Sequence, residues 1–355
     1  MKKIFLFVFL WFLSGSLFAA IDEMVFFGDS LTDNGNLYRI LKFIPRSPPY
    51  YEGRFSNGPT WAETVAQHYE KTFDLPYTIY AYGGATALAQ APTAGDQFFT
   101  PITLQGEIYE FYLASLFSDK SNKLYVIWIG ANDYLMDKET DVDTLTSQVV
   151  DQISEGVFSL IGKGARYFLI LNLPDLGSPP YAEINDLKDR LHSLSEMHNE
   201  KLAKAIEGFN NLNSNIKVLS LDAYGIFNDL LVNTKKYNEK YKVNLTVLNK
   251  ACWQGGLTFN NRATSSLLYL KTDLQNKLLA NQVNDSAALT NQVIASPGLK
   301  EAYLKGRMRE LGLNPCSNPD QYVFWDLIHP TEVVHQILSA ITIENIDSHA
   351  KDLFS

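Results

Sequence analysis

The stretch "MVFFGDSLTDNGNLY", residues 24–38, begins with four apolar residues and then changes abruptly to small and polar ones. A short, continuous apolar run of this kind is typical of a strand that is buried on both faces. Gly28, Asp29 and Ser30 follow it directly. The cluster can be read as a plain turn, or as a turn that presents Ser30 as a nucleophile, and the rest of the chain has to distinguish the two.

Four further segments resemble the first one, because they are short, continuous and rich in β-branched and aromatic residues. They are "YTIYAY" (77–82), "KLYVIWI" (123–129), "RYFLILNL" (166–173) and "IKVLSL" (216–221). Helical patterns lie between them, at residues 60–69, 142–164 and 187–209. Strands that alternate with helices predict an α/β fold, with a doubly wound, mainly parallel five-stranded sheet and helices on both faces.

The N-terminus has the layout of a secretory signal peptide. Lys2 and Lys3 precede an apolar segment at residues 4–13, and small residues follow it. A bilayer-spanning helix needs about 20 apolar residues, so this segment is short for a span. We therefore predict a signal peptide at residues 1–19, a mature domain at 20–355, and a secreted (extracellular or periplasmic) protein. Leu17 occupies a position where cleavage favours a small residue, so an uncleaved anchor is the alternative.

The composition of the 355 residues limits the classes of partner. A net charge of −9 argues against nucleic acid, because there is no surplus of cationic side chains to neutralise phosphates. Hydrophobic residues make up 46% of the chain and aromatic residues 13%, which allows a large core and leaves contact with a membrane surface open. We expect no metal and no cofactor: "DSLTDNGN" is faintly similar to a calcium loop, but Leu31 occupies a ligand position.

Cys252 and Cys316 are the two cysteines of the chain. In an exported protein they most simply form one disulfide, which by loop closure could stabilise the fold by about 4 kcal/mol. Two buried free thiols are the alternative. The segment they enclose, about 250–316, is rich in Asn, Gln, Ser, Ala and Leu and carries no strand signal. We interpret it as an insertion that acts as a lid or regulatory loop; a passive helical decoration is the alternative.

Small and polar residues follow each of the first four predicted strands, at 28–30, 83–86, 130–133 and 174–177. Ligands of open α/β sheets bind outside the carboxyl ends of the strands. These clusters should therefore gather at one edge of the sheet, which favours Ser30 as a nucleophile. Asp29 is expected to hold the turn.

A serine nucleophile needs a base, and the base is most often a histidine. Five of the six histidines lie in helix-like or terminal polar contexts that favour packing or solvent exposure: His68, His192, His198, His335 and His349. His329 differs, because Asp326 precedes it by three residues and Pro330 fits the first turn of a following helix. Asp326 could orient one ring nitrogen while the other accepts the serine proton. Taken alone, the motif is equally compatible with a helix cap.

Donors for an oxyanion can also be named. Ser30 offers its backbone N–H if it opens a helix, one glycine of Gly83–Gly84 offers a second, and Asn132 offers a side-chain amide. For Asn132 and Asp133 a helix cap is the alternative reading.

The chain resembles the GDSL, or SGNH, family of lipases and esterases. "FFGDSLTDNGN", "YGGATA", "GAND" and "DLIHP" resemble its four blocks and occur in the family's order. Within the family, the chain most resembles secreted bacterial phospholipase A, lysophospholipase and glycerophospholipid–cholesterol acyltransferase enzymes. These have a stretch similar to "CWQGG" and a cysteine shortly before a stretch similar to "PDQYVFWDLIHPT".

The resemblance implies a flavodoxin-like SGNH hydrolase fold. It also implies Ser30 as nucleophile, His329 as base and Asp326 as its orienter, with Ser30, Gly84 and Asn132 as the oxyanion hole. The expected activity is two-step hydrolysis of phospholipid or lysophospholipid acyl esters at a membrane surface, with a sterol as a possible second acceptor. Similar enzymes are activated by a protease that cuts inside the disulfide loop. Rival readings are a carbohydrate esterase, a small-ester esterase and a non-catalytic lipid-binding protein.

Overall fold

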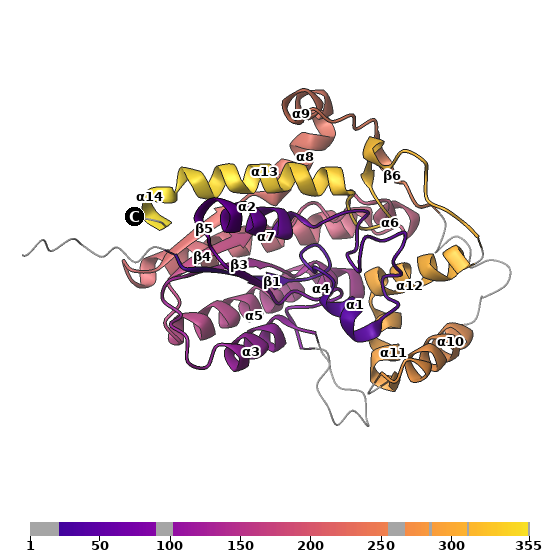
Figure 1. Ribbon diagram of the computed structural model, residues 1–355, viewed down its shortest axis with the longest axis horizontal. Coiled ribbons are helices and arrows are strands. Elements are labelled where there is room, and N and C mark those ends of the chain that lie inside the picture. Colours follow the sequence, from indigo (N-terminus) through magenta and orange to yellow (C-terminus); the bar gives the residue numbers. More distant parts are fainter. Residues whose placement is uncertain (1–20, 90–101, 255–266, 284–285, 311, 354–355) are drawn as a thin grey trace, which may run out of the picture.

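The computed structural model describes residues 21–89, 102–254, 267–283, 286–310 and 312–353. Its centre is a parallel five-stranded sheet with the order β2-β1-β3-β4-β5 (Figure 1). The strands are β1 (Glu23–Gly28), β2 (Tyr77–Ile79), β3 (Lys123–Trp128), β4 (Tyr167–Leu171) and β5 (Lys217–Leu221). All five predicted strands are present, and the doubly wound α/β prediction is confirmed.

The strand order reverses between β1 and β3, which is where open α/β sheets form their binding crevice. The two strands pair in register from Glu23 opposite Lys123 to Gly28 opposite Trp128. Their carboxyl ends therefore lie side by side, and the residues after Gly28 and after Trp128 share one edge of the sheet.

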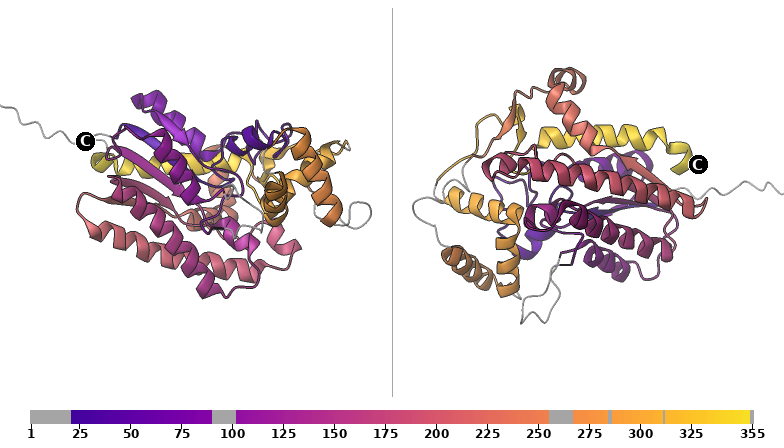
Figure 2. Two further views of the ribbon diagram at one scale, coloured as in Figure 1. Left: turned by 90° about the horizontal axis from the view of Figure 1, so that it is seen from below. Right: turned by 180° about the vertical axis from the view of Figure 1, so that it is seen from behind.

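Alternate residues of each strand enter opposite halves of the core. On β1, Val25 and Phe27 pack on one face, whereas Met24 and Phe26 pack on the other. Helices cover both faces, with α3, α5 and α7 on one side and α2 and α13 on the other (Figures 1 and 2). These helices are α2 (Trp61–Phe73), α3 (Leu104–Ala114), α5 (Val142–Gly162), α7 (Lys188–Leu212) and α13 (Glu332–Ser348). The helical patterns at 60–69, 142–164 and 187–209 are thus confirmed.

Shorter helices complete the fold around this core. They are α1 (Asn36–Leu41), α4 (Ala131–Met136), α6 (Pro180–Ile184), α8 (Ala223–Val232), α9 (Thr234–Tyr241), α14 (Ala350–Leu353) and the 3₁₀ turn η2 (Pro319–Gln321).

The ends of the strands differ from the prediction by up to three residues, and two differences, one at a strand and one at a helix, have a clear cause. Strand β2 ends at Ile79 instead of Tyr82, because the Asn36 side-chain amide donates to the carbonyls of Ile79 and Ala81, at 2.8 Å each. Pro330 is not in the first turn of α13, which begins at Glu332 after Thr331. The Ser56 hydroxyl donates to the carbonyl of Pro330 at 2.9 Å and so anchors this residue ahead of the helix.

A second, two-stranded parallel sheet was not predicted. It pairs β6 (Val247–Ala251) with β7 (Tyr322–Phe324), so a strand reaches into the segment that we read as free of strands. Asn249 and Lys250 of β6 are exposed, and the pattern therefore lacks the buried alternation that marks a strand in a sequence.

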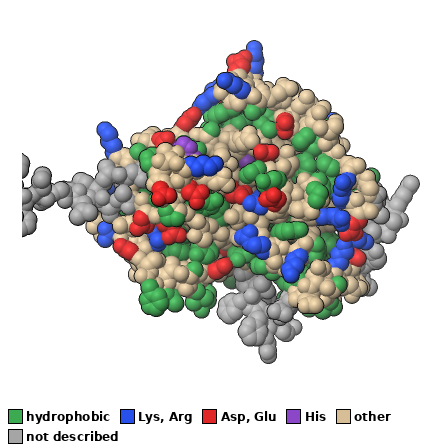
Figure 3. Space-filling model, in the orientation of Figure 1, with side chains coloured by type: hydrophobic (Ala, Val, Ile, Leu, Met, Phe, Trp, Pro, Cys, Tyr) green, Lys and Arg blue, Asp and Glu red, His purple; other side chains and the backbone are tan. Residues whose placement is uncertain are grey.

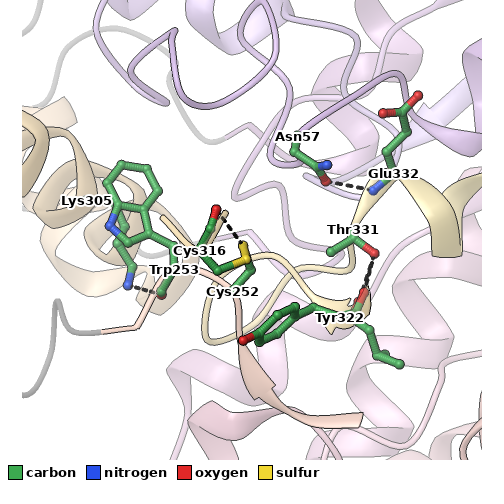
Figure 4. The surroundings of a disulfide bond; sticks show 9 residues. Asn57, Cys252, Trp253, Lys305, Cys316, Tyr322, Thr331 and Glu332 are labelled. Atoms are coloured by element: carbon green, nitrogen blue, oxygen red, sulfur yellow. Dashed lines mark hydrogen bonds between the residues drawn. A yellow bond between two sulfur atoms is a disulfide. The ribbon is translucent and has the colours of Figure 1, made fainter. Parts of the chain in front are cut away.

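The insertion follows β6 and contains α10 (Leu267–Ala280), α11 (Ser286–Ala295) and α12 (Pro297–Glu310). The expected disulfide between Cys252 and Cys316 is present (Figure 4). The Cys316 N–H also donates to the Cys252 carbonyl at 2.9 Å. In Figures 1 and 2 the insertion helices lie at the end of the molecule opposite the C-terminus.

The predicted signal peptide at residues 1–19 lies outside the described residues. Within the described ranges, no helix is both long enough and apolar enough to cross a bilayer.

Candidate active site

Ser30 lies in a tight turn directly after β1. The Asp29 carbonyl accepts from the N–H groups of Thr32 and Asp33 at 2.9 Å each, and the Asp29 carboxylate accepts from Leu31 N–H at 3.0 Å. Asp29 thus holds the turn, as expected. A Cβ at Gly28 would lie 2.5 Å from the Trp128 carbonyl oxygen, so the close approach of β3 requires a glycine there.

Ser30 does not open a helix, so the condition under which its N–H is named as a donor is not met by helix geometry. Helix α1 begins only at Asn36. The Asp33 carboxylate accepts from the N–H groups of Gly35 and Asn36, at 2.8 and 2.6 Å, and this local bonding holds the intervening residues in a loop.

The structure brings Ser30, His329 and Asp326 into one chain of hydrogen bonds. His329 Nε2 lies 2.9 Å from Ser30 Oγ, across 299 positions of sequence. His329 Nδ1 lies 2.9 and 3.0 Å from the two carboxylate oxygens of Asp326. All three side chains are buried. This is the arrangement in which a carboxylate orients an imidazole and the imidazole can accept a hydroxyl proton.

Asp326 is held as a carboxylate by its surroundings. Burial alone would raise its pKa, but the His329 ring and the hydrogen bonds around it outweigh that effect and lower the pKa below its ordinary value. The N–H groups of Ile328 and His329 donate to Oδ1 at 2.8 Å each, and the Tyr50 hydroxyl donates to Oδ2 at 2.6 Å. Burial, together with Asp326, raises the pKa of Tyr50, which keeps this phenol protonated as a donor.

The predicted oxyanion donors lie along the same edge. Asn132 is in the first turn of α4, just after β3, and its side-chain amide donates to the Ala85 carbonyl at 2.8 Å. The Gly83 N–H donates to the Asp33 carboxylate at 2.7 Å, so it is already engaged. Gly84 has a φ of 80°, and among the described residues no acceptor engages its N–H or that of Ser30.

Buried carboxylates position this edge. Asp133 is not a helix cap, because Gly130 occupies that position; its carboxylate accepts from the N–H groups of Ala87 and Leu88 at 2.9 Å each. Burial raises the pKa of Asp29 and of Asp33 to about 6, and that of Asp133 to about 7.

Two functional neighbours were missed by the sequence analysis. The Glu107 carboxylate of α3 accepts from the N–H groups of Gly28 and Tyr82, at 2.9 and 3.2 Å, and burial raises its pKa well above the ordinary value. Glu107 therefore links the residues at the ends of β1 and β2. The second missed neighbour is Tyr50, which contacts Asp326. Both act through contacts distant in sequence, and no local pattern marks either residue.

The remaining histidines have other surroundings. His198 Nδ1 lies 2.7 Å from the Tyr134 hydroxyl, and burial lowers its pKa to about 3. Burial likewise lowers the pKa of His335 to about 3. His192 is partly exposed beside Asp175, at 3.0 Å. In the described part of the chain, no group of three or more His, Cys, Asp or Glu residues could hold a metal ion.

An apolar cleft opens beside Ser30 and His329. It encloses about 740 Å³, part of it open solvent. Its apolar walls are formed mainly by Leu31, Leu135, Leu176, Tyr181, Phe227, Leu231, Phe324 and Ile328. The space next to the serine hydroxyl is therefore bounded mainly by apolar side chains.

The first turn of α12 packs directly on the site. A Cβ at Gly298 would lie 3.6 Å from His329 Nε2 and 4.0 Å from Asn132 Oδ1. Leu299 is buried against Gly84, where a Cβ would lie 2.6 Å from Leu299 Cδ1. The insertion therefore covers the edge of the sheet at which these side chains meet.

A buried ion pair lies in the same helix. Glu301 and Lys305 approach to 3.2 Å with both side chains fully buried. Burial raises the pKa of Glu301 to about 7, despite the neighbouring Lys305. Lys305 also donates to the carbonyl of Trp253, next to the disulfide (Figure 4). Helix α12 is thus bonded to the point at which the insertion begins.

Comparison with known proteins supports a family assignment. The chain is 31% identical over 335 residues to a phosphatidylcholine-sterol acyltransferase of Aeromonas hydrophila, covering 93% of this chain and 91% of the relative. It is 25% identical over 333 residues to the secreted effector protein SseJ of Salmonella typhimurium, covering 93% of this chain and 64% of the relative.

Among solved structures, an acetylxylan esterase of Geobacillus stearothermophilus matches with 13% identity and a TM-score of 0.39, covering 60% of this chain and 81% of that one. A family model described as GDSL-like lipase/acylhydrolase matches residues 24–341, a span that includes Ser30, Asn132 and His329. The chain therefore belongs to the GDSL-like lipase/acylhydrolase family.

Proposed function

We propose that this family member is a serine acylhydrolase that cleaves fatty acyl esters of phospholipids and lysophospholipids through an acyl-enzyme on Ser30. One observation carries the proposal: Ser30 Oγ lies 2.9 Å from His329 Nε2 at the mouth of an apolar cleft. The hydroxyl, its base and a site for a hydrocarbon chain thus meet at one point.

In the first step Ser30 Oγ attacks the ester carbonyl, and His329 Nε2 takes the hydroxyl proton. Asp326 accepts from Nδ1–H, which fixes the tautomer and stabilises the imidazolium. The carbonyl oxygen becomes an oxyanion, for which the N–H groups of Ser30 and Gly84 and the Asn132 amide are the proposed donors. The tetrahedral intermediate then expels the alcohol, which takes the proton from His329, and the acyl group remains on Ser30.

In the second step water attacks the acyl-enzyme and gives its proton to His329. The second tetrahedral intermediate releases the fatty acid and returns the proton to Ser30. A sterol hydroxyl in place of water would yield a sterol ester by the same route. The name of the Aeromonas relative, a phosphatidylcholine-sterol acyltransferase, supports both the lipid substrate and the sterol acceptor.

Regulation by the insertion is part of the proposal. The Gly298–Leu299 turn fills the space in front of His329 and Gly84. An ester carbonyl that reaches Ser30 and the oxyanion donors needs that space. Cleavage by a protease between Cys252 and Cys316 would allow α12 to leave while the disulfide keeps the two ends joined.

We also propose that the protein is exported, with residues 1–19 as signal peptide. The lysines and apolar segment at the N-terminus support export, as does the disulfide, because disulfides persist in oxidising compartments.

The test is fatty acid release from lysophosphatidylcholine by purified mature protein, with protease-nicked and intact samples side by side. Ser30→Ala is the control, and cholesterol is added in a parallel series. We expect release that is faster after nicking and absent in Ser30→Ala. Cleavage of acetylated sugars or short soluble esters, without release from the lipid, would replace the phospholipid proposal with the corresponding esterase. Failure of a fluorophosphonate to label Ser30 in the nicked protein would overturn the serine mechanism.

A further inference from the structure

A second hollow lies at the opposite end of α12 from Ser30. It lies between the segment from Tyr38 to Ser47 and the insertion helices α10 and α12. Its volume is about 550 Å³, part of which is open solvent. The α12 residues that line it run from Tyr303 to Glu310, so it begins about 8 Å along the helix axis from Gly298, and it shares no lining residue with the cleft at Ser30. A ligand bound here is therefore distinct from the ester at Ser30.

The charged side chains of this hollow are mostly cationic. Lys42, Arg46, Lys277 and Arg307 line it, and Glu310 is the one carboxylate among the lining residues. We call this set the cationic hollow. Tyr38, Phe43 and Tyr303 supply its aromatic wall.

Three of the cations converge on the one carboxylate. Arg46 Nη1 and Lys277 Nζ each lie 2.8 Å from Glu310 Oε1, and Arg307 bonds to the other oxygen. Arg307 Nε also lies 3.2 Å from Asp273, just outside the lining set. Lys42 forms no ion pair with any described residue. Counting both carboxylates, four cationic side chains face two anionic ones, which leaves a local surplus of positive charge.

This surplus contrasts with the rest of the molecule, whose net charge is −9. Figure 3 shows Lys and Arg side chains gathered toward the right of the face in view, the side on which α10 and α12 lie in Figure 1. An anionic ligand repelled by the protein as a whole would be attracted to this position.

We propose that the cationic hollow binds a phosphate group, carried either by a lipid headgroup or by free phosphate. Guanidinium groups suit phosphate because their paired N–H donors match two of its oxygens. The phosphate takes the place of the Glu310 carboxylate among Arg46, Lys277 and Arg307. The side chains of these four residues are 28–40% exposed, so an anion from solvent can reach them.

Binding is measured in Ser30→Ala protein so that lipid hydrolysis does not intervene. Vesicles of phosphatidylcholine alone are compared with vesicles that also contain phosphatidylglycerol, by co-sedimentation at constant ionic strength. Inorganic phosphate is titrated separately by calorimetry. We expect at least one anionic probe to bind. Binding to mixed vesicles alone identifies the headgroup as the source, and binding of phosphate alone identifies the soluble ion.

Variants then assign the binding to the hollow. Arg46→Ala with Lys277→Ala should weaken it by roughly 25-fold, because each cation near an anionic surface contributes roughly five-fold. Glu310→Gln should strengthen it by removing the competing carboxylate. Lys240→Ala is the matched control, since Lys240 forms a comparable ion pair with Glu344, at 3.0 Å, on another surface.

Either of two results would overturn the proposal. One is the absence of any binding of phosphate and of any preference for the anionic vesicles. The other is an affinity of the double variant equal to that of Lys240→Ala. Because every readout is binding by a protein without its serine hydroxyl, the result does not depend on the proposed hydrolysis.

Discussion

Replacing Tyr50 with Phe removes one of the four groups that donate hydrogen bonds to the Asp326 carboxylate and leaves the other three in place. Those three come from the N–H groups of Ile328 and His329 and from the His329 ring. The ring of Tyr50 packs against Phe55, Trp253 and Trp325, and Phe preserves these contacts. The change therefore isolates a single bond, 2.6 Å long, to a buried charge.

A hydrogen bond to a charged group contributes about 1.5–3 kcal/mol, so we expect Tyr50→Phe to lower the free energy of unfolding by about 2 kcal/mol at pH 7. The effect depends on pH with a definite sign. The folded state lowers the pKa of Asp326, so its contribution is complete above the unfolded pKa of about 3.9 and is lost as the pH falls through the lower folded value. Tyr50→Phe raises the folded pKa, and the difference between the two proteins should shrink below about pH 4.

The assay is urea unfolding followed by tryptophan fluorescence at several pH values, with the disulfide intact. Tyr125→Phe is the matched control, because Tyr125 is equally buried and donates to the neutral carbonyl of Lys120 at 3.0 Å. It should cost about 1 kcal/mol, with no dependence on the titration of Asp326. The reasoning is refuted if the two variants lose the same free energy at every pH.

Three further outcomes are expected. Asn132→Ala should still fold, although it loses the hydrogen bond to the Ala85 carbonyl, and should lower the rate of fatty acid release by about 10²–10³; a normal rate would remove Asn132 from the oxyanion hole. Replacing Cys252 and Cys316 together with Ser should lower the free energy of unfolding by up to about 4 kcal/mol in urea, whereas an unchanged midpoint would contradict the loop-closure argument. Leu299→Ala should weaken the packing of α12 on Gly84 and increase the turnover of the uncut protein, and a slower uncut protein would show that α12 does not restrain the site.

The fold was predictable from local patterns to a large extent. The five strands of the main sheet are covered on both faces, so each is a continuous apolar run that stands out in the sequence. Strand β6 was missed because its pairing with β7 depends on a partner more than 70 positions away, and two of its own residues are exposed. The end of β2 was misplaced because the Asn36 side chain bonds to the carbonyls of Ile79 and Ala81, at and just beyond the end of the strand.

The sequence by itself determined which chemistry-bearing residues follow each strand, because parallel strands must present their carboxyl ends at one edge. Ser30 and Asn132 could be named on that basis, and His329 from Asp326 three residues before it and Pro330 after it. Only the tertiary structure decided how the edge is held: Tyr50 reaches Asp326, and Glu107 joins Gly28 to Tyr82, through contacts that no local pattern encodes. It also decided that α12 lies over His329, because where a helix packs depends on the complementary surface of distant residues, and its own sequence does not carry that information.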